Sequence, residues 1–230
     1  DKYSCAQILR ELANKFPDIF PLAFEAAKTI PDEHNRAIAM RELAAKLTDT
    51  LLPDALNAAK AIENEYQRAE FLKELTAKLP DTLFPHVLAA AKAFQEESYR
   101  FNILIELTSK LPDILLLDIL NAVKTFHNES YRFELIRELA LKLPESLLFD
   151  VLDVVKAFQD ESYSASILNI LAIKFPDALL PNLLNQVQTF RNESCPPDII
   201  SSLVVKLPEW LLPDVLIVVR EIQDDYSRAI

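Results

Sequence analysis

Apolar residues recur at helical spacing in short segments of this chain, and polar residues separate one segment from the next. In the segment 97–111, the apolar face of the predicted helix consists of Ile103, Leu104, Leu107 and Leu111. In the preceding segment, the equivalent face consists of Val87, Leu88, Ala91 and Phe94. A Leu-Pro step at Leu111 and Pro112 ends the first of these helices, because proline disfavours helical geometry in the residue before it. The pattern predicts pairs of amphipathic helices.

The helix pair is the unit of an internal repeat. A lysine marks its register at Lys15, Lys46, Lys78, Lys110, Lys142, Lys174 and Lys206. The step from Lys15 to Lys46 is 31 residues, and every later step is 32 residues. A leucine keeps the same register at Leu12, Leu43, Leu75, Leu107, Leu139, Leu171 and Leu203. Seven units are complete, and the stretch Asp224-Asp225-Tyr226-Ser227-Arg228-Ala229 begins an eighth.

A single hairpin of two such helices cannot bury its apolar faces, whereas stacked copies form one continuous core. We therefore predict an all-α fold, a right-handed α-solenoid of seven 31–32-residue helical hairpins plus the start of an eighth. The whole chain, 1–230, is predicted to be one repeat domain, with units at approximately 1–31, 32–63, 64–95, 96–127, 128–159, 160–191 and 192–223 and a partial unit at 224–230. The seventh unit is unusually apolar for the end of an array, so we expect a fragment of a longer chain.

Capping residues are predicted at the start of both helices of each unit. Asn or Asp precedes the first helix at Asp32, Asn64, Asn128, Asp160, Asn192 and Asp224. Aspartate precedes the second helix at Asp18, Asp49, Asp81, Asp113 and Asp177. Such side chains accept hydrogen bonds from free N–H groups of the first helical turn. Capping also explains the glycosylation-like triplets that begin at Asn128 and Asn192.

The repeat resembles the αα-hairpin solenoids of the HEAT, armadillo and tetratricopeptide class, and the resemblance covers the whole chain. The motif Asp32-Glu33-His34-Asn35-Arg36-Ala37 is also similar to 32-residue repeats in large bacterial multidomain proteins, including NTPase-linked sensors. The period is shorter than that of the tetratricopeptide family, and the Trp-Leu-Gly-Tyr pattern of that family does not occur. The resemblance implies an interaction scaffold that serves as the sensor or interaction arm of a larger protein.

Composition narrows the range of functions. The 230 residues include 14 prolines and no glycine, where average usage of about 7% corresponds to roughly 16 glycines. Phosphate-binding loops, dinucleotide fingerprints and nucleophile elbows all depend on glycine, so none is expected. No nucleophile–base pair and no metal set falls on one predicted surface. We therefore predict neither an enzyme nor a cofactor.

Charge argues against polyanionic partners. Asp and Glu number 35 against 24 Lys and Arg, which gives a net charge of -11. This balance disfavours nucleic acid and anionic membrane surfaces. No run of 18 apolar residues occurs, so no membrane-spanning helix is predicted.

Cysteine and histidine add little chemistry. Cys5 and Cys195 lie six units apart, too far for a disulfide, and reduced thiols favour a cytoplasmic location. His34, His86 and His127 occupy three different positions of the repeat, so no zinc-binding cluster is expected.

Two charged ladders follow the predicted first helices. Glu and Lys four residues apart, as at Glu106 and Lys110, are interpreted as helix support. Acidic residues and Arg also pair three residues apart, at Glu33/Arg36, Glu65/Arg68, Glu97/Arg100, Glu129/Arg132 and Asp225/Arg228. Each arginine is predicted to lie near the aromatic residue of the preceding second helix, such as Phe94 or Phe126, and to lock neighbouring units together.

The best candidate for a binding site is the ridge of the second helices, which we expect to be exposed. Asn and Asp alternate there with small residues, and an amide can bond both the N–H and the C=O of an extended peptide, as in armadillo-type solenoids. The acidic members favour a basic guest. The predicted partner-binding residues are Asp54, Asn57, His86, Asp118, Asn121, Asp150, Asp153, Asn182 and Asn185. A solvated face without a ligand is the alternative interpretation.

The leading hypothesis is therefore a non-enzymatic scaffold for a protein or an extended, basic peptide. The alternative is a nucleic-acid-binding solenoid that uses the column Lys28, Lys60, Lys92, Lys124, Lys156, Gln188 and Arg220. A column on the outer face of the first helices becomes apolar along the chain, through Asn14, Ala45, Ala77, Ser109, Leu141, Ile173 and Val205. That apolar column indicates a contact with a ligand, with another subunit or with the rest of a longer chain. Self-association through the open ends of the solenoid is a further expectation.

Overall fold

The computed structural model describes residues 7–9, 11–12, 15–44, 47–110, 112–174, 176, 180–181 and 209–221. Every regular element in these residues is an α-helix or a short 3-10 helix, so the predicted all-α class is confirmed for this part of the chain. The chain divides into two compact units, Asp1–Leu115 and Leu116–Ile230, and each is described by itself. The assignment of residues 1–230 to a single repeat domain stays a prediction.

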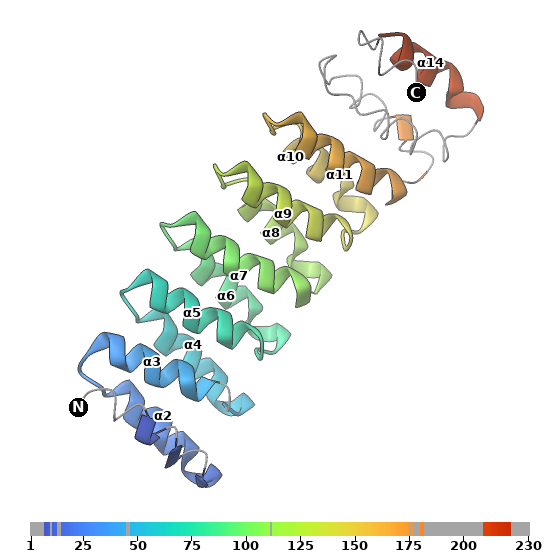
Figure 1. The fold of residues 1–230 in the computed structure, drawn as a ribbon. Helices are drawn as coiled ribbons and strands as arrows, with labels where there is room; N and C mark the ends of the chain where they lie inside the picture. The colour runs from blue at the N-terminus through green and yellow to red at the C-terminus, as the bar shows by residue number, and fades with distance from the viewer. Residues whose placement is uncertain are drawn as a thin grey trace. The chain divides into compact units, whose positions relative to one another are not determined.

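The first unit alternates longer and shorter helices (Figure 1). The longer ones, the first helices of the predicted hairpins, are α3 (Glu33–Ala44), α5 (Glu65–Thr76) and α7 (Glu97–Lys110). The shorter second helices are α2 (Phe20–Lys28), α4 (Leu52–Lys60) and α6 (Phe84–Lys92). Short 3-10 turns precede the second helices as η1 (Pro17–Ile19), η2 (Asp49–Leu51) and η3 (Asp81–Leu83), and η4 (Asp113–Leu115) ends the unit.

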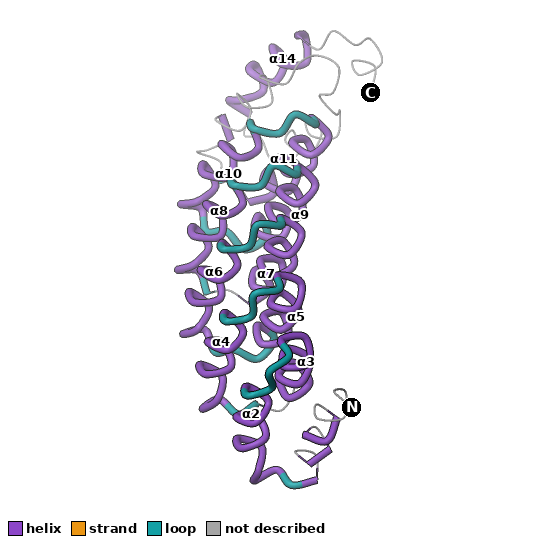
Figure 2. The backbone as a smooth tube through the Cα atoms, turned by 90° about the vertical axis from the view of Figure 1, so that its left-hand side faces the viewer, coloured by secondary structure: helices purple, strands orange, loops and turns teal. Residues whose placement is uncertain are grey.

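The helices of the first unit form two layers. α3, α5 and α7 pack side by side in chain order, and α2, α4 and α6 each pack against the first helix that follows. Figure 2 shows the second helices of this unit along one side and the first helices along the other. Contacts therefore join neighbours in the sequence, as expected for stacked helical hairpins.

The core of the first unit lies between these layers. Phe24, Phe71 and Phe84 are almost completely buried there. The apolar faces predicted from the sequence point into this core. The buried residues include Val87, Leu88 and Ala91 of α6, Phe94 just after α6, and Ile103, Leu104 and Leu107 of α7. Leu111, the last residue of the predicted face, lies outside the described residues.

The second unit repeats the arrangement. Its helices are α8 (Leu116–Val123), α9 (Glu129–Ala140), α10 (Leu148–Val155) and α11 (Glu161–Lys174), with η5 (Glu145–Leu147) before α10. Later in the sequence, η7 (Glu209–Leu211) leads into α14 (Leu212–Glu221). α8 packs on α9, α10 packs on α11, and α9 lies beside α11. Leu135, Ile136 and Leu139 of α9 are fully buried in this core.

The predicted caps of the first helices are confirmed where the structure describes them. The side chains of Asp32, Asn64, Asn128 and Asp160 each accept a hydrogen bond from a backbone N–H two or three residues later, at 2.9–3.1 Å. The Ser162 hydroxyl also donates to Asp160 at 2.6 Å. These hydrogen bonds, that of the hydroxyl first, hold the pKa of the Asp160 carboxyl below its usual value. Asn192 and Asp224 lie outside the described residues.

The predicted caps of the second helices are wrong at Asp49 and Asp81. Each of these aspartates begins a 3-10 turn, and the α-helix starts three residues later with no side-chain hydrogen bond at its cap. Proline occupies the first turn of both helices, at Pro53 and Pro85. Because proline has no N–H to satisfy, its presence reduces the need for a capping side chain.

Candidate partner-binding surface

In the first unit, the predicted binding residues lie on the exposed sides of two second helices. Asp54 and Asn57 are exposed on α4, whose opposite face buries Leu52 and Leu56. His86 is exposed on α6. Since side chains three residues apart in a helix are neighbours, Asp54 and Asn57 present a carboxylate and an amide together.

The second unit has the same pairing of polar groups. Asp118 and Asn121 are exposed on α8. On α10, Asp153 is exposed and Asp150 is half-buried. The two remaining predicted residues, Asn182 and Asn185, lie outside the described residues. Within each unit the polar groups thus follow the second helices, on the face that points away from the core.

Lysines of the adjacent column neutralise part of this acidic ridge. Lys28 Nζ donates to Glu25 Oε1 at 2.8 Å and to Asp54 Oδ2 at 2.9 Å, so it links α2 to α4. The hydrogen bonds to Glu25 and then to Asp54 raise the pKa of Lys28 above its ordinary value. In the second unit, Lys156 Nζ lies 3.5 Å from Asp153 Oδ1 in an exposed pair. These lysines are already engaged by carboxylates of the chain itself.

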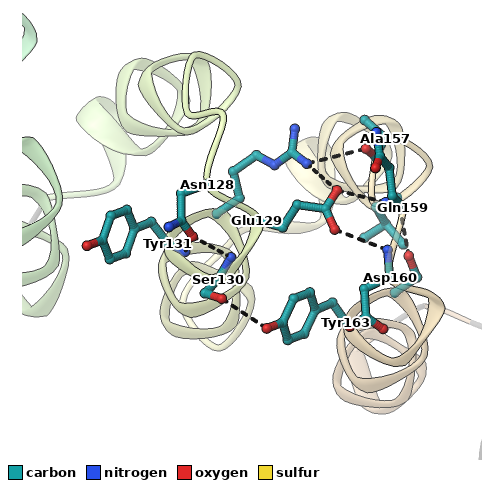
Figure 3. A network of polar contacts seen from close by, with 11 residues as sticks. Asn128, Glu129, Ser130, Tyr131, Ala157, Gln159, Asp160 and Tyr163 are labelled. Atoms are coloured by element: carbon teal, nitrogen blue, oxygen red, sulfur yellow. Dashed lines mark hydrogen bonds and ion pairs between the residues drawn. The ribbon is translucent and has the colours of Figure 1, made fainter. Parts of the chain in front are cut away.

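The Glu–Arg ladder forms a structural link between successive hairpins, which Figure 3 shows for the second unit. The Glu129 carboxylate accepts hydrogen bonds from Arg132 Nη2 at 2.7 Å, Gln159 N at 2.7 Å and Asp160 N at 3.1 Å. The Arg132 guanidinium lies over the ring of Phe158, 5.1 Å from its centroid. One carboxylate therefore joins α9 to the loop that precedes α11.

The first unit contains the same link around Arg68. Its Nη1 donates to Ile62 O at 2.6 Å, and its Nη2 donates to Glu65 Oε1 at 3.2 Å. The guanidinium carbon lies 4.7 Å from the ring centroid of Phe94. Glu65 in turn accepts from Gln95 N at 2.9 Å. The ladder therefore locks neighbouring hairpins, the role expected from the sequence.

The predicted aromatic neighbour of this arginine is wrong. Arg68 and Arg132 stack on the ring that ends the following second helix, rather than on the residue that ends the preceding one. For Arg68, the end of the preceding helix supplies a carbonyl acceptor at Ile62 instead. Arg68 thus donates a hydrogen bond to the preceding hairpin and stacks its planar face on a ring of the following one.

A cavity opens at the first of these links, where the stacking ring is missing. Ile62 occupies the position 32 residues before Phe94, so Arg36 has an isoleucine where Arg68 has a phenylalanine. Arg36 Nη1 still donates to Ile30 O at 2.7 Å, and its ion pair with Glu33 is long, at 4.0 Å. The cavity has a volume of about 220 Å³ and is lined by Lys28, Arg36, Met40, Ala58, Ala61 and Ile62. Sequence reasoning missed this feature, although the change from Phe to Ile was visible in the repeat.

Sequence reasoning also missed a role of the lysine that marks the register. Lys174 Nζ donates to Leu141 O at 2.6 Å and to Leu143 O at 3.2 Å, near the end of the preceding first helix. Partial burial lowers the pKa of Lys174. The predicted i, i+4 support is formed at Glu106 and Lys110, at 3.0 Å. The residue four before Lys174 is Ile170, so this lysine has no glutamate for an i, i+4 pair. This difference in the sequence could have indicated that Lys174 binds elsewhere.

The second unit has exposed apolar residues, one of them in the column that was expected to become apolar. Leu141, in the outer column of the first helices, is 60% exposed. Leu216 and Ile217 on α14 and Trp210 in the preceding turn are also exposed. In the first unit, the equivalent column holds the exposed small residues Ala77 and Ser109. Asn14, Ala45 and Val205 of this column are not among the described residues.

Among the described residues, no three His, Cys, Asp or Glu side chains are placed to hold a metal ion. No described helix combines the length and apolar character that a membrane span requires. Cys5 and Cys195 lie outside the described residues. Comparisons with models of protein families, with curated proteins and with solved structures gave no significant match.

Proposed function

We propose that this chain is a non-enzymatic scaffold, a right-handed α-solenoid of the HEAT, armadillo and tetratricopeptide class. In this proposal it binds a protein or an extended, basic peptide along its second helices. The observation that carries the proposal is the repetition of exposed acid–amide pairs on helices whose opposite faces are buried, as at Asp54 and Asn57 on α4 and at Asp118 and Asn121 on α8. Such a scaffold would act as the sensor or interaction arm of a larger protein.

The chemistry of these pairs suits an extended peptide. An exposed amide supplies both a donor and an acceptor, so Asn57 and Asn121 match the two polar groups of a peptide backbone. Neighbouring carboxylates steer a basic partner toward the surface and disfavour an acidic one. Contacts that repeat along one peptide add up through effective concentration, so modest individual contacts suffice.

Nucleic-acid binding is the second candidate, and the ion pairs of the ridge weigh against it. Phosphate binding needs lysines whose charge is available to the polyanion. Lys28 lies between Glu25 and Asp54, and Lys156 lies beside Asp153. A phosphate approaching these lysines also meets the carboxylates that hold them.

The test compares a double variant of the ridge with a control on another face. Asn57→Ala combined with Asn121→Ala removes two exposed amides, and we expect about tenfold weaker binding of a fluorescent, lysine-rich decapeptide, measured by anisotropy. Asn102→Ala removes an exposed amide from the first helix α7 and should leave affinity unchanged. Melting temperatures of both variants should match that of the parent chain, because all three amides are exposed.

Two results would contradict the proposal. Equal affinity of the parent and the double variant would show that this ridge is not the binding surface. Tighter binding of single-stranded DNA than of the peptide, with a steep decrease as salt is raised, would favour the nucleic-acid alternative.

A further inference from the structure

Two links within the chain show how an arginine of the first helices accommodates an aromatic ring. The guanidinium carbon of Arg68 lies 4.7 Å from the ring centroid of Phe94, and that of Arg132 lies 5.1 Å from Phe158. Both rings are supplied by the end of the following second helix. Stacking of this kind combines cation–π attraction with burial of the ring.

Arg36, the first arginine of this ladder, has no ring in this place. Ile62 stands at the corresponding position, and the space beside it forms the cavity of about 220 Å³. A closed apolar cavity of about 150 Å³ is large enough to hold benzene, so this cavity has room for a phenyl group. The Arg36 side chain is 25% exposed, whereas those of Arg68 and Arg132 are 16% and 13% exposed. The face of Arg36 is thus more open to an incoming ring.

The walls of the cavity are suited to an aromatic group. Met40 and Ile62 are buried apolar residues, and Ala58 and Ala61 leave room between them. Arg36 is held in place because its Nη1 donates to Ile30 O at 2.7 Å and to Pro31 O at 3.3 Å. The guanidinium is therefore preorganised to receive a ring on its face, which lowers the entropic cost of binding.

The charges around the cavity favour basic residues beside that ring. Lys28 at the wall is bonded to both Glu25 and Asp54, and Glu33 lies near Arg36. These five side chains comprise three carboxylates and two cations, so their sum is negative. Asp54 belongs to the ridge of α4, and Ala58 and Ala61 follow it on the same helical face.

We propose that this cavity binds an aromatic side chain of the partner peptide, stacked on Arg36 in the place that Phe94 takes on Arg68, with basic residues on either side. The proposal rests on the proposed function, since it identifies the anchor residue of the peptide bound by the ridge. A phenylalanine side chain is the occupant that the internal examples indicate.

The chain contains a single methionine, and it lines the cavity, so its methyl group reports directly on occupancy. We would titrate the full 230-residue chain, carrying a ¹³C label on the Met40 methyl group, with an acetylated and amidated Lys-Phe-Lys tripeptide. A bound ring should give a saturable, upfield ring-current shift of this methyl signal. The same tripeptide with cyclohexylalanine in place of phenylalanine keeps the shape and loses the π face. It should bind at least about tenfold more weakly if cation–π attraction contributes as expected.

Two reciprocal variants provide the matched control. Ile62→Phe places the missing ring in the cavity and should abolish the Met40 shift. Phe94→Ile removes the ring from Arg68 and should create a second tripeptide site, detected as a doubled stoichiometry by calorimetry. An unchanged Met40 shift in the Ile62→Phe chain, or none in the parent chain, would overturn the proposal, and so would equal affinity for the cyclohexyl tripeptide.

The outcome also separates this proposal from the proposed function. If the tripeptide fails to bind while the decapeptide still depends on Asn57 and Asn121, the ridge stands and the cavity proposal is overturned. If the tripeptide shifts Met40 while the decapeptide is insensitive to the double variant, the aromatic site stands without the ridge.

Discussion

Glu129 receives hydrogen bonds from two parts of the chain that are about thirty residues apart. Arg132 donates from the same helix, while Gln159 N and Asp160 N donate from the loop before α11. The side chain of Glu129 is only 21% exposed, so water does not readily replace these donors. A charged acceptor of this kind stabilises the junction more than an exposed surface ion pair does.

Replacing Glu129 with glutamine tests this role. Glu129→Gln removes the negative charge and turns an amide NH₂ toward groups that donate, so we expect the free energy of unfolding to decrease by about 1–2 kcal/mol. Urea denaturation followed by circular dichroism measures the change. Glu138→Gln, in the same helix but 44% exposed and 3.7 Å from Arg137, is the control and should change stability by less than about 0.5 kcal/mol. Equal effects of the two variants would mean that the loop contacts add nothing.

The sequence predicts that these Glu–Arg pairs link units, but it does not predict the ring that each arginine selects. A helical wheel places each arginine on the core side of its helix, but it does not show which of the two neighbouring hairpins the guanidinium faces. The choice depends on how successive hairpins stack, which brings Phe94 over the guanidinium and the Ile62 carbonyl to its edge. Such non-local geometry is not encoded in the spacing of a single unit.

The two kinds of helix begin differently, although an acidic or amide residue precedes both in the sequence. Asn64 accepts from Gln67 N at 3.1 Å and so caps α5 directly. Asp81 starts the turn η3, and α6 begins after Leu83 without a side-chain cap. Many helices end with a residue in left-handed geometry, which is usually glycine. In this chain α2, α4 and α6 end at Thr29, Ala61 and Ala93 in right-handed geometry. Helix termination of this kind does not require glycine, which is consistent with a chain that contains none.

Alanine substitution at these two positions should therefore have unequal effects. Asn64→Ala removes a side-chain cap, and we expect it to lower the free energy of unfolding by about 1 kcal/mol. Asp81→Ala removes an exposed side chain that caps no α-helix, and we expect a change of less than about 0.5 kcal/mol. Thermal and urea unfolding of the two variants measure the difference. A larger loss at Asp81 than at Asn64 would contradict the cap assignment.

The candidate ridge was predictable because it depends on helical spacing alone. Once Leu52, Ala55 and Leu56 are assigned to the core, the face that bears Asp54 and Asn57 must point away from it. The cavity at Arg36 was not predicted, because its volume results from three helices meeting around a residue that is smaller than its counterpart. Neither the ridge nor the cavity identifies the partner, because that identity depends on the sequence of a second molecule.

At the scale of the whole chain, packing contacts among the described helices of each unit join elements that are close in the sequence. In the first unit α3 packs on α5 and α5 on α7, and in the second unit α9 packs on α11. These contacts divide the chain into two compact units, Asp1–Leu115 and Leu116–Ile230. In an array of this type, stability is approximately the sum of local terms and nearest-neighbour terms, so damage to one hairpin should remain local.

Hydrogen exchange on two matched core variants tests whether stability is local. Leu75 in α5 and Leu139 in α9 hold the same position of the repeat, and both are fully buried. Leu139→Ala should cost about 2–5 kcal/mol locally and accelerate amide exchange in α9, α10 and α11 while α3 and α5 keep the parent rates. Leu75→Ala should give the reverse pattern, because each cavity weakens the contacts of its own neighbours. Mass spectrometry of exchanged peptides resolves these segments. Uniform acceleration in every helix, from either variant, would show instead that the chain unfolds as one cooperative block and that nearest-neighbour packing does not set its stability.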